Sequence, residues 1–186
     1  MSDWQLIDAL ETEALPALLE STFAQLYNDD FADAMMGINH QLKVEVRGWH
    51  VKDNWAMGVL LTPWMLTKIY IPLSAPNDIA IPADWQADAR QNAPYVVIGS
   101  LMTLTIDGQP HTVHINYHPT LGHYCVQPLV QKMNGYANNE AAFAAWGEVL
   151  AFRKEYRAKL QAEAEDAAKK AAEIDAGKRN LLTRWL

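Results

Sequence analysis

The sequence contains only one cysteine, Cys125, among its 186 residues. A single thiol cannot form a disulfide bond within the chain, and it cannot build the cysteine cages that hold structural zinc or iron–sulfur clusters. One free thiol suits a reducing compartment, so we expect a cytoplasmic protein. We interpret Cys125 as a half-buried structural thiol, and a nucleophile assisted by the nearby His123 is the alternative.

Long apolar runs and familiar catalytic motifs are also missing. No apolar run approaches the ~20 residues of a membrane-spanning helix, and residues 1–5 lack the basic segment of a signal peptide. We therefore expect neither a signal peptide nor membrane insertion. The sequence has no Gly-x-Ser-x-Gly elbow, no phosphate-binding loop and no dinucleotide fingerprint, and its acidic residues form no obvious pair. These absences indicate a protein that is not an enzyme, and an enzyme with an unrecognised site stays open as an alternative.

Basic residues are scarce in most of the chain. Residues 1–139 carry 14 acidic and 6 basic residues, a net charge of −8, whereas residues 140–186 carry 8 acidic and 9 basic ones. The acidic region repels phosphate backbones, so we expect no nucleic-acid binding. It would instead attract a basic peptide, and simple solubility is the plain alternative.

Most of the acidic region reads as a sheet with flanking helices. Residues 14–27 carry apolar side chains at steps of three and four, which predicts a helix, and residues 127–136 read as a second, short one. Asp107-Gly108 is a strong hairpin signal, and residues 74–95 form a long loop. The predicted class is therefore α+β, with an antiparallel sheet of about five strands. These strands cover residues 42–51, 55–62, 66–73, 96–106 and 109–117.

The character of the sequence changes at Asn139, which can cap a helix. Residues 140–176 contain no proline, so we predict one long helix that Gly177 ends. We divide the chain into an α+β domain, residues 1–139, and a C-terminal helix with a basic, apolar tail, residues 140–186.

The apolar stripe of that long helix is bulky before Leu160 and mostly alanine after it. We expect the first half to pack on the α+β domain. The second half buries little area, so it is either a solvated helix or a weak seam for a partner.

An unusual turn joins two of the predicted strands at Thr62-Pro63-Trp64-Met65. Pro63 suits a turn, because its fixed φ helps and its missing N–H costs no ladder bond. Turn tips are normally polar, yet Trp64 and Met65 stand there side by side. Either they fold back onto the core, or they form a surface for another chain.

This stretch resembles a known family. Trp55, Gly58 and Val59, the 62–65 turn and the following strand that ends at Pro72 are similar to the signature of the HybE-type [NiFe]-hydrogenase assembly chaperones. The segment of residues 36–46 resembles the family's approach to its first strand. The similarity is clear over residues 36–72 and looser over residues 15–120.

The resemblance implies a cytoplasmic, non-enzymatic chaperone without a cofactor, which binds immature hydrogenase subunits before assembly and export. The implied partner is the small-subunit precursor with its twin-arginine export signal, and the large subunit is a second candidate. An apolar, adaptable patch within acidic surroundings suits such a peptide. Our candidate partner-binding residues are Trp55, Gly58, Thr62, Pro63, Trp64, Met65 and Trp85.

Four histidines, His111, His114, His118 and His123, fall within thirteen residues. Converging imidazoles would suit nickel or zinc, so a nickel-handling or metal-sensing protein is the main alternative function, with His114 and His118 as candidate ligands. No carboxylate or thiolate lies between His111 and Tyr124. We therefore expect no metal site and interpret the histidines as solvated side chains on the outer face of the sheet.

The final ten residues, 177–186, combine three cations and four large apolar side chains with no acidic one. They resemble the Arg-Arg-x-x-Leu-type ending of some members of the family. They also resemble the twin-arginine export signal of hydrogenase small subunits, with Lys178-Arg179 in place of the two arginines. Such a tail could dock on its own domain, dock on a partner or fray.

Overall fold

The computed structural model describes residues 3–7, 11–34, 36–76 and 79–183. Its helices are α1 (Leu15–Leu26), the π-helix η1 (Tyr27–Phe31), the 3-10 helix η2 (Ala83–Trp85), α2 (Ala87–Arg90) and α3 (Asn139–Thr183). Its strands are β1 (Glu45–Lys52), β2 (Trp55–Leu61), β3 (Leu66–Pro72), β4 (Leu101–Ile106), β5 (Gln109–His118) and β6 (Gly122–Val130). The chain forms two compact units, Met1–Ala142 and Phe143–Leu186. Among the described residues, no helix combines the length and the apolar character that a membrane span requires.

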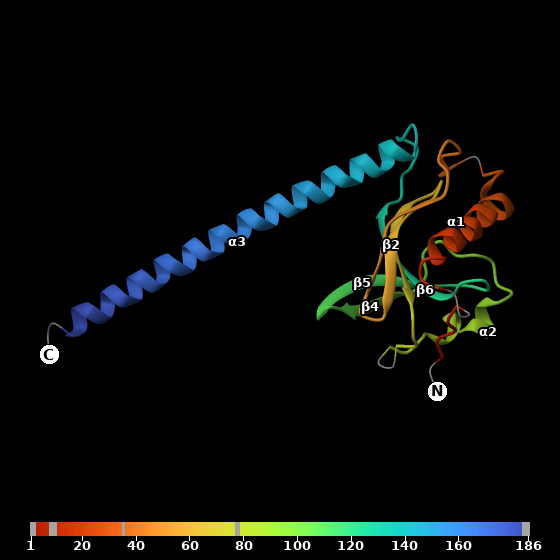
Figure 1. Cartoon of the computed structure of the whole chain (residues 1–186). Helices are drawn as coiled ribbons and strands as arrows, with labels where there is room; N and C mark the ends of the chain where they lie inside the picture. Colours follow the sequence, from red (N-terminus) through yellow and green to blue (C-terminus); the bar gives the residue numbers. More distant parts are fainter. Residues whose placement is uncertain (1–2, 8–10, 35, 77–78, 184–186) are drawn as a thin grey trace. The chain divides into compact units, whose positions relative to one another are not determined.

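The six strands form one antiparallel sheet in the order β1-β2-β3-β6-β5-β4 (Figure 1). Strands that follow one another in the chain are neighbours in the sheet, except that the connection between β3 and β4 crosses to the far edge. The predicted α+β class, with an antiparallel sheet and a long C-terminal helix, is confirmed. The sheet has six strands where we predicted about five.

The strand that the sequence did not reveal is β6, which lies between β3 and β5. Our prediction of a helix over residues 127–136 was wrong, because β6 runs through the first part of this range and the described residues 131–138 form no helix. Residues 123–126 are buried, and ladders on both sides satisfy the backbone of the strand. Pro128, which has no N–H, lies near the irregularity in the ladder with β3.

Helix α1 covers one face of the sheet (Figure 1). Pro16 lies in its first turn as predicted, where a missing N–H leaves no helical hydrogen bond unmade. The buried side chains of α1 join residues of β2, β3 and β6 in a first core cluster. Burying one leucine or phenylalanine contributes roughly 2 kcal/mol. The helix supplies Leu15, Leu19, Phe23 and Leu26 to this cluster.

The opposite face of the sheet carries a second core cluster. Side chains alternate between the two faces along a strand, and so Ile69 and Val126 belong to the first cluster while Tyr70 and Cys125 belong to the second. The segment of residues 3–7 and the loop with η2 close this second face, since Trp4, Ile81 and Trp85 are part of the cluster. Both faces of the central strands β2 and β3 and of the first half of β6 are therefore buried, which explains their nearly continuous apolar sequences.

One buried histidine, His123, fastens the N-terminal segment to the sheet. Its Nδ1 accepts the backbone N–H of Gln5 at 2.7 Å, so Nε2 carries the proton and donates to the carbonyl oxygen of Trp85 at 2.9 Å. The neighbouring Gly122 has φ +66, and a Cβ there would clash with the carbonyl oxygen of Gln5. Burial lowers the pKa of His123, and the hydrogen bonds to Trp85 and Gln5 only partly oppose this effect.

The turns of two distant hairpins meet at one end of the sheet. Lys52 Nζ lies 2.5 Å from Asp107 Oδ2, and the backbone N–H of Asp107 donates to Asp53 Oδ2 at 2.7 Å. Because these turns join β1 to β2 and β4 to β5, the contact shows that the sheet curls until its two outer hairpins touch. The predicted hairpin at Asp107-Gly108 is confirmed, and positive φ angles at both residues give it the type I′ geometry that matches strand twist.

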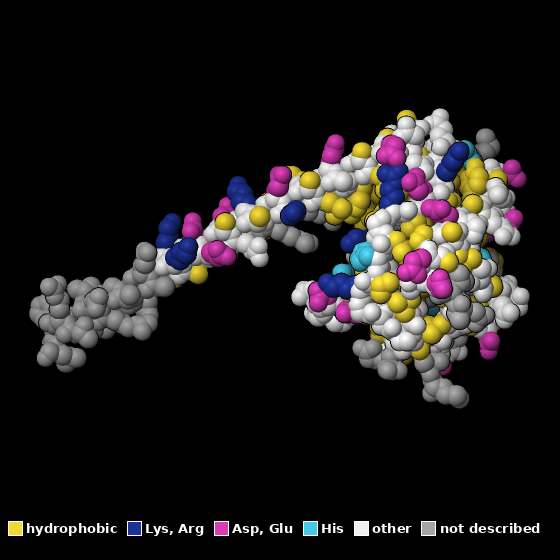
Figure 2. Space-filling view, viewed as in Figure 1, with side chains coloured by type: hydrophobic (Ala, Val, Ile, Leu, Met, Phe, Trp, Pro, Cys, Tyr) yellow, Lys and Arg dark blue, Asp and Glu magenta, His cyan; other side chains and the backbone are white. Residues whose placement is uncertain are grey.

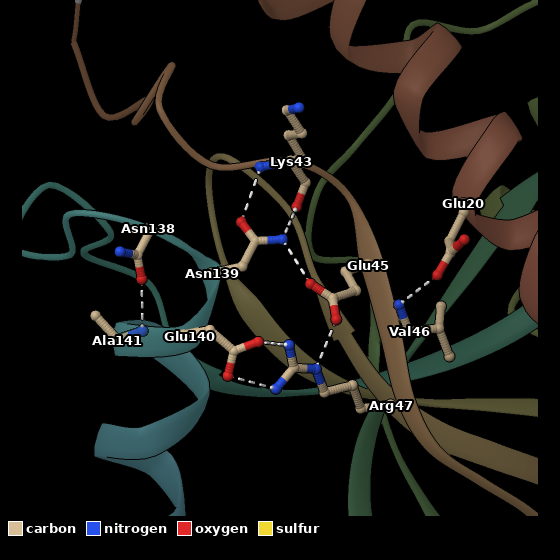
Figure 3. Close-up of polar contacts among 9 residues, drawn as sticks. All are labelled: Glu20, Lys43, Glu45, Val46, Arg47, Asn138, Asn139, Glu140 and Ala141. Atoms are coloured by element: carbon tan, nitrogen blue, oxygen red, sulfur yellow. Dashed lines mark hydrogen bonds and ion pairs between the residues drawn. The ribbon is translucent and has the colours of Figure 1, made fainter.

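The first turn of α3 is bonded to β1 (Figure 3). Arg47 donates from its two terminal nitrogens to the carboxylate of Glu140, and its Nε donates to Glu45 Oε1 at 2.6 Å. These hydrogen bonds raise the pKa of Arg47, and the bond from Arg47 lowers the pKa of Glu140. Asn139, which we expected to cap the helix, instead bonds to the backbone of Lys43 at 3.0 and 3.1 Å.

The cap is supplied by Asn138, whose Oδ1 accepts the N–H of Ala141 at 2.9 Å. At its other end α3 continues through Gly177 to Thr183, so our prediction that Gly177 ends the helix was wrong. A glycine inside a helix costs only about 1 kcal/mol, and no proline follows it. The last three residues of the predicted tail, 184–186, lie outside the described residues.

Candidate partner-binding surface

The 62–65 turn is held by a closed set of hydrogen bonds. The backbone N–H of Thr62 donates to the carbonyl oxygen of Met65 at 2.9 Å, and the Thr62 hydroxyl accepts the N–H of Met65 at 3.0 Å. A threonine at this position therefore closes the turn with both its backbone and its side chain. The carbonyl oxygen of Pro63 accepts the N–H of Asn39 at 2.8 Å, which ties the turn to a remote segment.

Asn39 joins the two stretches on which the family resemblance rests. It is buried, and its side-chain amide donates to the carbonyl oxygens of Met133 and Tyr136 at 2.9 and 2.7 Å. Its backbone holds the 62–65 turn as described above. The segment of residues 36–46, the turn and the loop before α3 are thus packed around a single asparagine.

The tip of the turn folds back onto the core. Trp64 is 5% exposed and Met65 is 1% exposed, and both belong to the cluster under α1. Trp64 stacks on Phe31 with ring centroids 4.4 Å apart, and Phe23 lies on it at 6.5 Å. Of the two arrangements that the sequence left open, the structure has the buried one.

The other candidate residues lie elsewhere in the core. Trp55 contacts Trp4 edge to face at 6.0 Å, and Trp85, with the Arg90 guanidinium 4.7 Å from its ring, lies in the same second cluster. Gly58 is buried, and a Cβ there would lie 2.9 Å from the Trp49 ring. The structure therefore brings Thr62, Pro63, Trp64 and Met65 together under one face of the sheet and places Trp55 and Trp85 on the opposite face. Direct contact of these residues with a partner stays a prediction.

The surface segment next to Trp64 was not singled out from the sequence. We call it the acidic segment and define it as residues 28–34 together with Met36. It exposes Asp29, Asp30 and Asp33, and Met36 is 89% exposed. The segment begins in the π-helix η1, a geometry that often occurs at functional sites.

Two hydrogen bonds of His40 hold the two ends of residues 27–34 together. The carbonyl oxygen of Ala34 can only accept, so His40 Nε2 donates to it at 3.1 Å and His40 Nδ1 accepts the hydroxyl of Tyr27 at 2.6 Å. Phe31, half-buried at the end of η1, rests on Trp64 and meets Tyr95 edge to face at 6.2 Å. Trp64 therefore supports Phe31, the aromatic residue of the acidic segment.

The acidic segment can bind cations beside apolar groups. The ion pairs of the described residues join Arg47 to Glu45 and Glu140, and Lys52 to Asp107. Within the part of the chain that the structure describes, the three aspartates of the segment thus have no cationic partner. Flexible methionine side chains adapt to varied apolar ligands. The only sequence signal for this surface was the run Asn28-Asp29-Asp30 after the first helix.

The histidines do not form a group. His123 is buried, which corrects our interpretation of four solvated side chains, and His114 donates from Nδ1 to the carbonyl oxygen of Gly99 at 2.9 Å. His118 accepts the N–H of Thr120 at 3.2 Å, and burial lowers its pKa. Among the described residues, no three histidine, cysteine or acidic side chains are placed to hold a metal ion.

Cys125 is fully buried beside Met102, with the two sulfur atoms 3.7 Å apart. Burial raises the pKa of its thiol far above the usual value. Both ring nitrogens of His123 are already bonded to the backbone, so neither is free to activate this thiol. Cys125 is a structural residue of the second core cluster.

Comparison with protein families gave a match that covers most of the chain. A family model described as "[NiFe]-hydrogenase assembly, chaperone, HybE" matches residues 14–184. It therefore includes the sheet, α1, the acidic segment and all of α3. The comparisons with curated proteins and with solved structures gave no match.

Proposed function

The chain belongs to the HybE family of [NiFe]-hydrogenase assembly chaperones, and on this premise we propose that its acidic segment binds the twin-arginine export signal of a hydrogenase small-subunit precursor. Membership of the family gives the chain a role in hydrogenase assembly and implies that it acts without catalysis. The precursor, the site and a cytoplasmic location are the proposed parts. The large subunit is a second candidate partner.

The observation that carries this proposal is the composition of the surface above Trp64. A twin-arginine peptide offers two guanidinium groups followed by apolar side chains. Carboxylates bind guanidinium groups through charge-assisted hydrogen bonds, often two at a time. Asp29, Asp30 and Asp33 supply such carboxylates, while Met36 and the exposed part of Phe31 supply apolar contacts beside them.

The buried candidate residues receive a supporting role in this proposal. Trp64 holds Phe31 in place, and Asn39 links the 62–65 turn to the end of the acidic segment. A residue that positions a binding surface is needed for affinity without touching the ligand. This role fits the burial of Thr62, Pro63, Trp64 and Met65.

Titration of a fluorescent twin-arginine peptide into the full chain tests the proposal. We expect the triple variant D29N, D30N and D33N to weaken binding at least about tenfold, equivalent to ~1.4 kcal/mol, at low salt. Added salt should shrink the difference, because exposed charges are screened.

A second triple variant, E11Q, D84N and D88N, is the matched control. It removes the same number of exposed carboxylates from other parts of the first unit. We expect it to weaken binding several times less at the same salt concentration, because its carboxylates lie outside the proposed site and contribute only general attraction. Equal weakening by both triple variants, or no weakening by either, would show that the acidic segment is not the site.

A further inference from the structure

Helix α3 exposes bulky apolar side chains on one stretch of its surface. Val149 is 41% exposed, Tyr156 is 55% exposed and Leu160 is 46% exposed. The rings of Phe152 and Tyr156 stack on the helix surface with centroids 6.3 Å apart. A row of exposed apolar side chains on a helix is typical of an interaction surface.

The row continues beyond Leu160 as alanines. An α-helix turns by about 100° per residue, which places Val149, Tyr156, Ala164, Ala167 and Ala171 within about 40° of the direction of Leu160. The one charged residue at a stripe position is Arg153, about 20° from Leu160. The described residues 149–171 thus form one straight stripe about 33 Å long, at ~1.5 Å per residue. Its first half is bulky and its second half is almost flat, because alanine has no side chain beyond Cβ.

We propose that this stripe binds the same stripe of a second copy of the chain, antiparallel and centred on Leu160. In this arrangement Tyr156 lies against Ala164 of the second copy, and Val149 lies against Ala171 of the second copy. Large side chains then fill the space that alanines leave. A two-fold axis through the centre repeats each contact, which is the usual symmetry of a homodimer.

A parallel, in-register pair of the same helices fits poorly. It would set Tyr156 against Tyr156 and Ala164 against Ala164, so the helices would be forced apart at one end and would leave a gap at the other. Packed interfaces need complementary surfaces of near-interior density. Only the antiparallel arrangement satisfies this need along the whole stripe.

The charges beside the stripe support the same register. Lys159, Glu163, Lys170 and Glu148 lie on one flank of the helix, at about 60–120° from Leu160. In the antiparallel pair, Lys159 and Glu163 of the second copy lie about 3 Å apart when measured along the helix axis. The same axial separation holds for Lys170 and Glu148 of the second copy. Each pairing occurs twice and joins opposite charges. Figure 2 shows how acidic and basic side chains alternate along the described part of α3.

Sedimentation of the full chain over a range of concentrations tests the dimer. L160E puts two like charges at the centre of the seam, and we expect it to raise the dimer dissociation constant at least about tenfold. A162E, about 160° away on the back of the helix, is the control and should leave it within about twofold. A chain that stays monomeric up to high micromolar concentration would overturn the proposal.

A charge exchange tests the register. K159E should weaken the dimer, and adding E163K should restore it, because the double variant rebuilds the same pairs with reversed signs. Circular dichroism of each variant checks that α3 remains helical. Failure of the second substitution to restore dimerisation, with the helix intact, contradicts the proposed register.

Cross-linking of exposed cysteines tests the orientation. A mixture of Y156C and A164C chains should form mixed disulfides several times faster than either variant forms them alone. The native Cys125 is buried and serves as the background control. Faster cross-linking of A164C with itself would show a parallel pair and refute the proposal.

Discussion

Trp64 stands out in the sequence as a candidate surface residue, yet it lies in the interior of the protein. Its ring is buried under α1, and the half-buried Phe31 rests on it at 4.4 Å. The sequence singled out Trp64 and Met65 but left open whether they face the core or a partner. That choice depends on α1 and Phe31, which reach the turn from more than thirty positions away in the chain, so local spacing could not decide it.

Substitutions of Trp64 and Phe31 separate support from direct contact. We expect W64F to retain peptide binding within about threefold, because phenylalanine can still stack on Phe31 with a centroid separation of the usual 4.5–7 Å. F31A should weaken binding at least about fivefold while lowering the free energy of unfolding by only about 1–2 kcal/mol, since its ring is half exposed. Peptide titration and chemical unfolding of both variants measure these effects.

The outcome that contradicts a supporting role for Trp64 is specific. If W64F unfolds at the same denaturant concentration as the unmodified chain and yet no longer binds peptide, Trp64 itself touches the partner. If F31A binds normally, Phe31 does not contribute to the surface.

The elements of the fold differ in how readily the sequence reveals them. Helix α1 and the hairpin at Asp107-Gly108 were predicted closely, because apolar spacing and a two-residue turn are local signals. We did not predict strand β6, because its extended conformation depends on pairing with two neighbouring strands and not on a pattern in its own residues. The acidic segment could not be recognised as a surface over Trp64, since its position follows from the π-helix η1 and from the bond between Tyr27 and His40.

The N-terminal segment is an element whose attachment should depend on pH. It is held by His123 in the neutral form, and burial lowers the pKa of that imidazole from its ordinary value of 6.5. Between the ordinary and the lowered pKa the unfolded chain binds a proton that the folded chain does not. Stability is therefore complete above about pH 6.5 and falls as the pH drops through the lowered pKa.

Thermal unfolding at pH 7.5 and at pH 5.5 tests this dependence. We expect the unfolding temperature of the unmodified chain to fall by several degrees more than that of H123Q over this interval, since glutamine can accept and donate without titrating. All other titratable groups are the same in both proteins, so their contributions cancel in the comparison. The same fall in both proteins would show that His123 does not link stability to pH.

The distribution of charge over the chain is consistent with the two proposed roles. Residues 1–139 carry a net charge of −8, suited to a cationic peptide, whereas residues 140–186 carry nearly balanced charges that fit a self-complementary helix. Our division into a domain of residues 1–139 and a C-terminal helix with its tail remains a proposal. Dimerisation through α3 would present two acidic segments, and each could bind one precursor independently.

Recovery of bound proteins from the native cell decides whether this chain is a chaperone for the small-subunit precursor. The full chain, carrying a small affinity tag, is purified under mild conditions, and its partners are identified and quantified by mass spectrometry. We predict a hydrogenase small-subunit precursor that retains its export signal, at about one per chain, and at least about tenfold less of it with the D29N, D30N and D33N variant, a loss of ~1.4 kcal/mol. Recovery of the large subunit alone, or equal recovery of a small subunit without its export signal, would contradict the proposed partner and site.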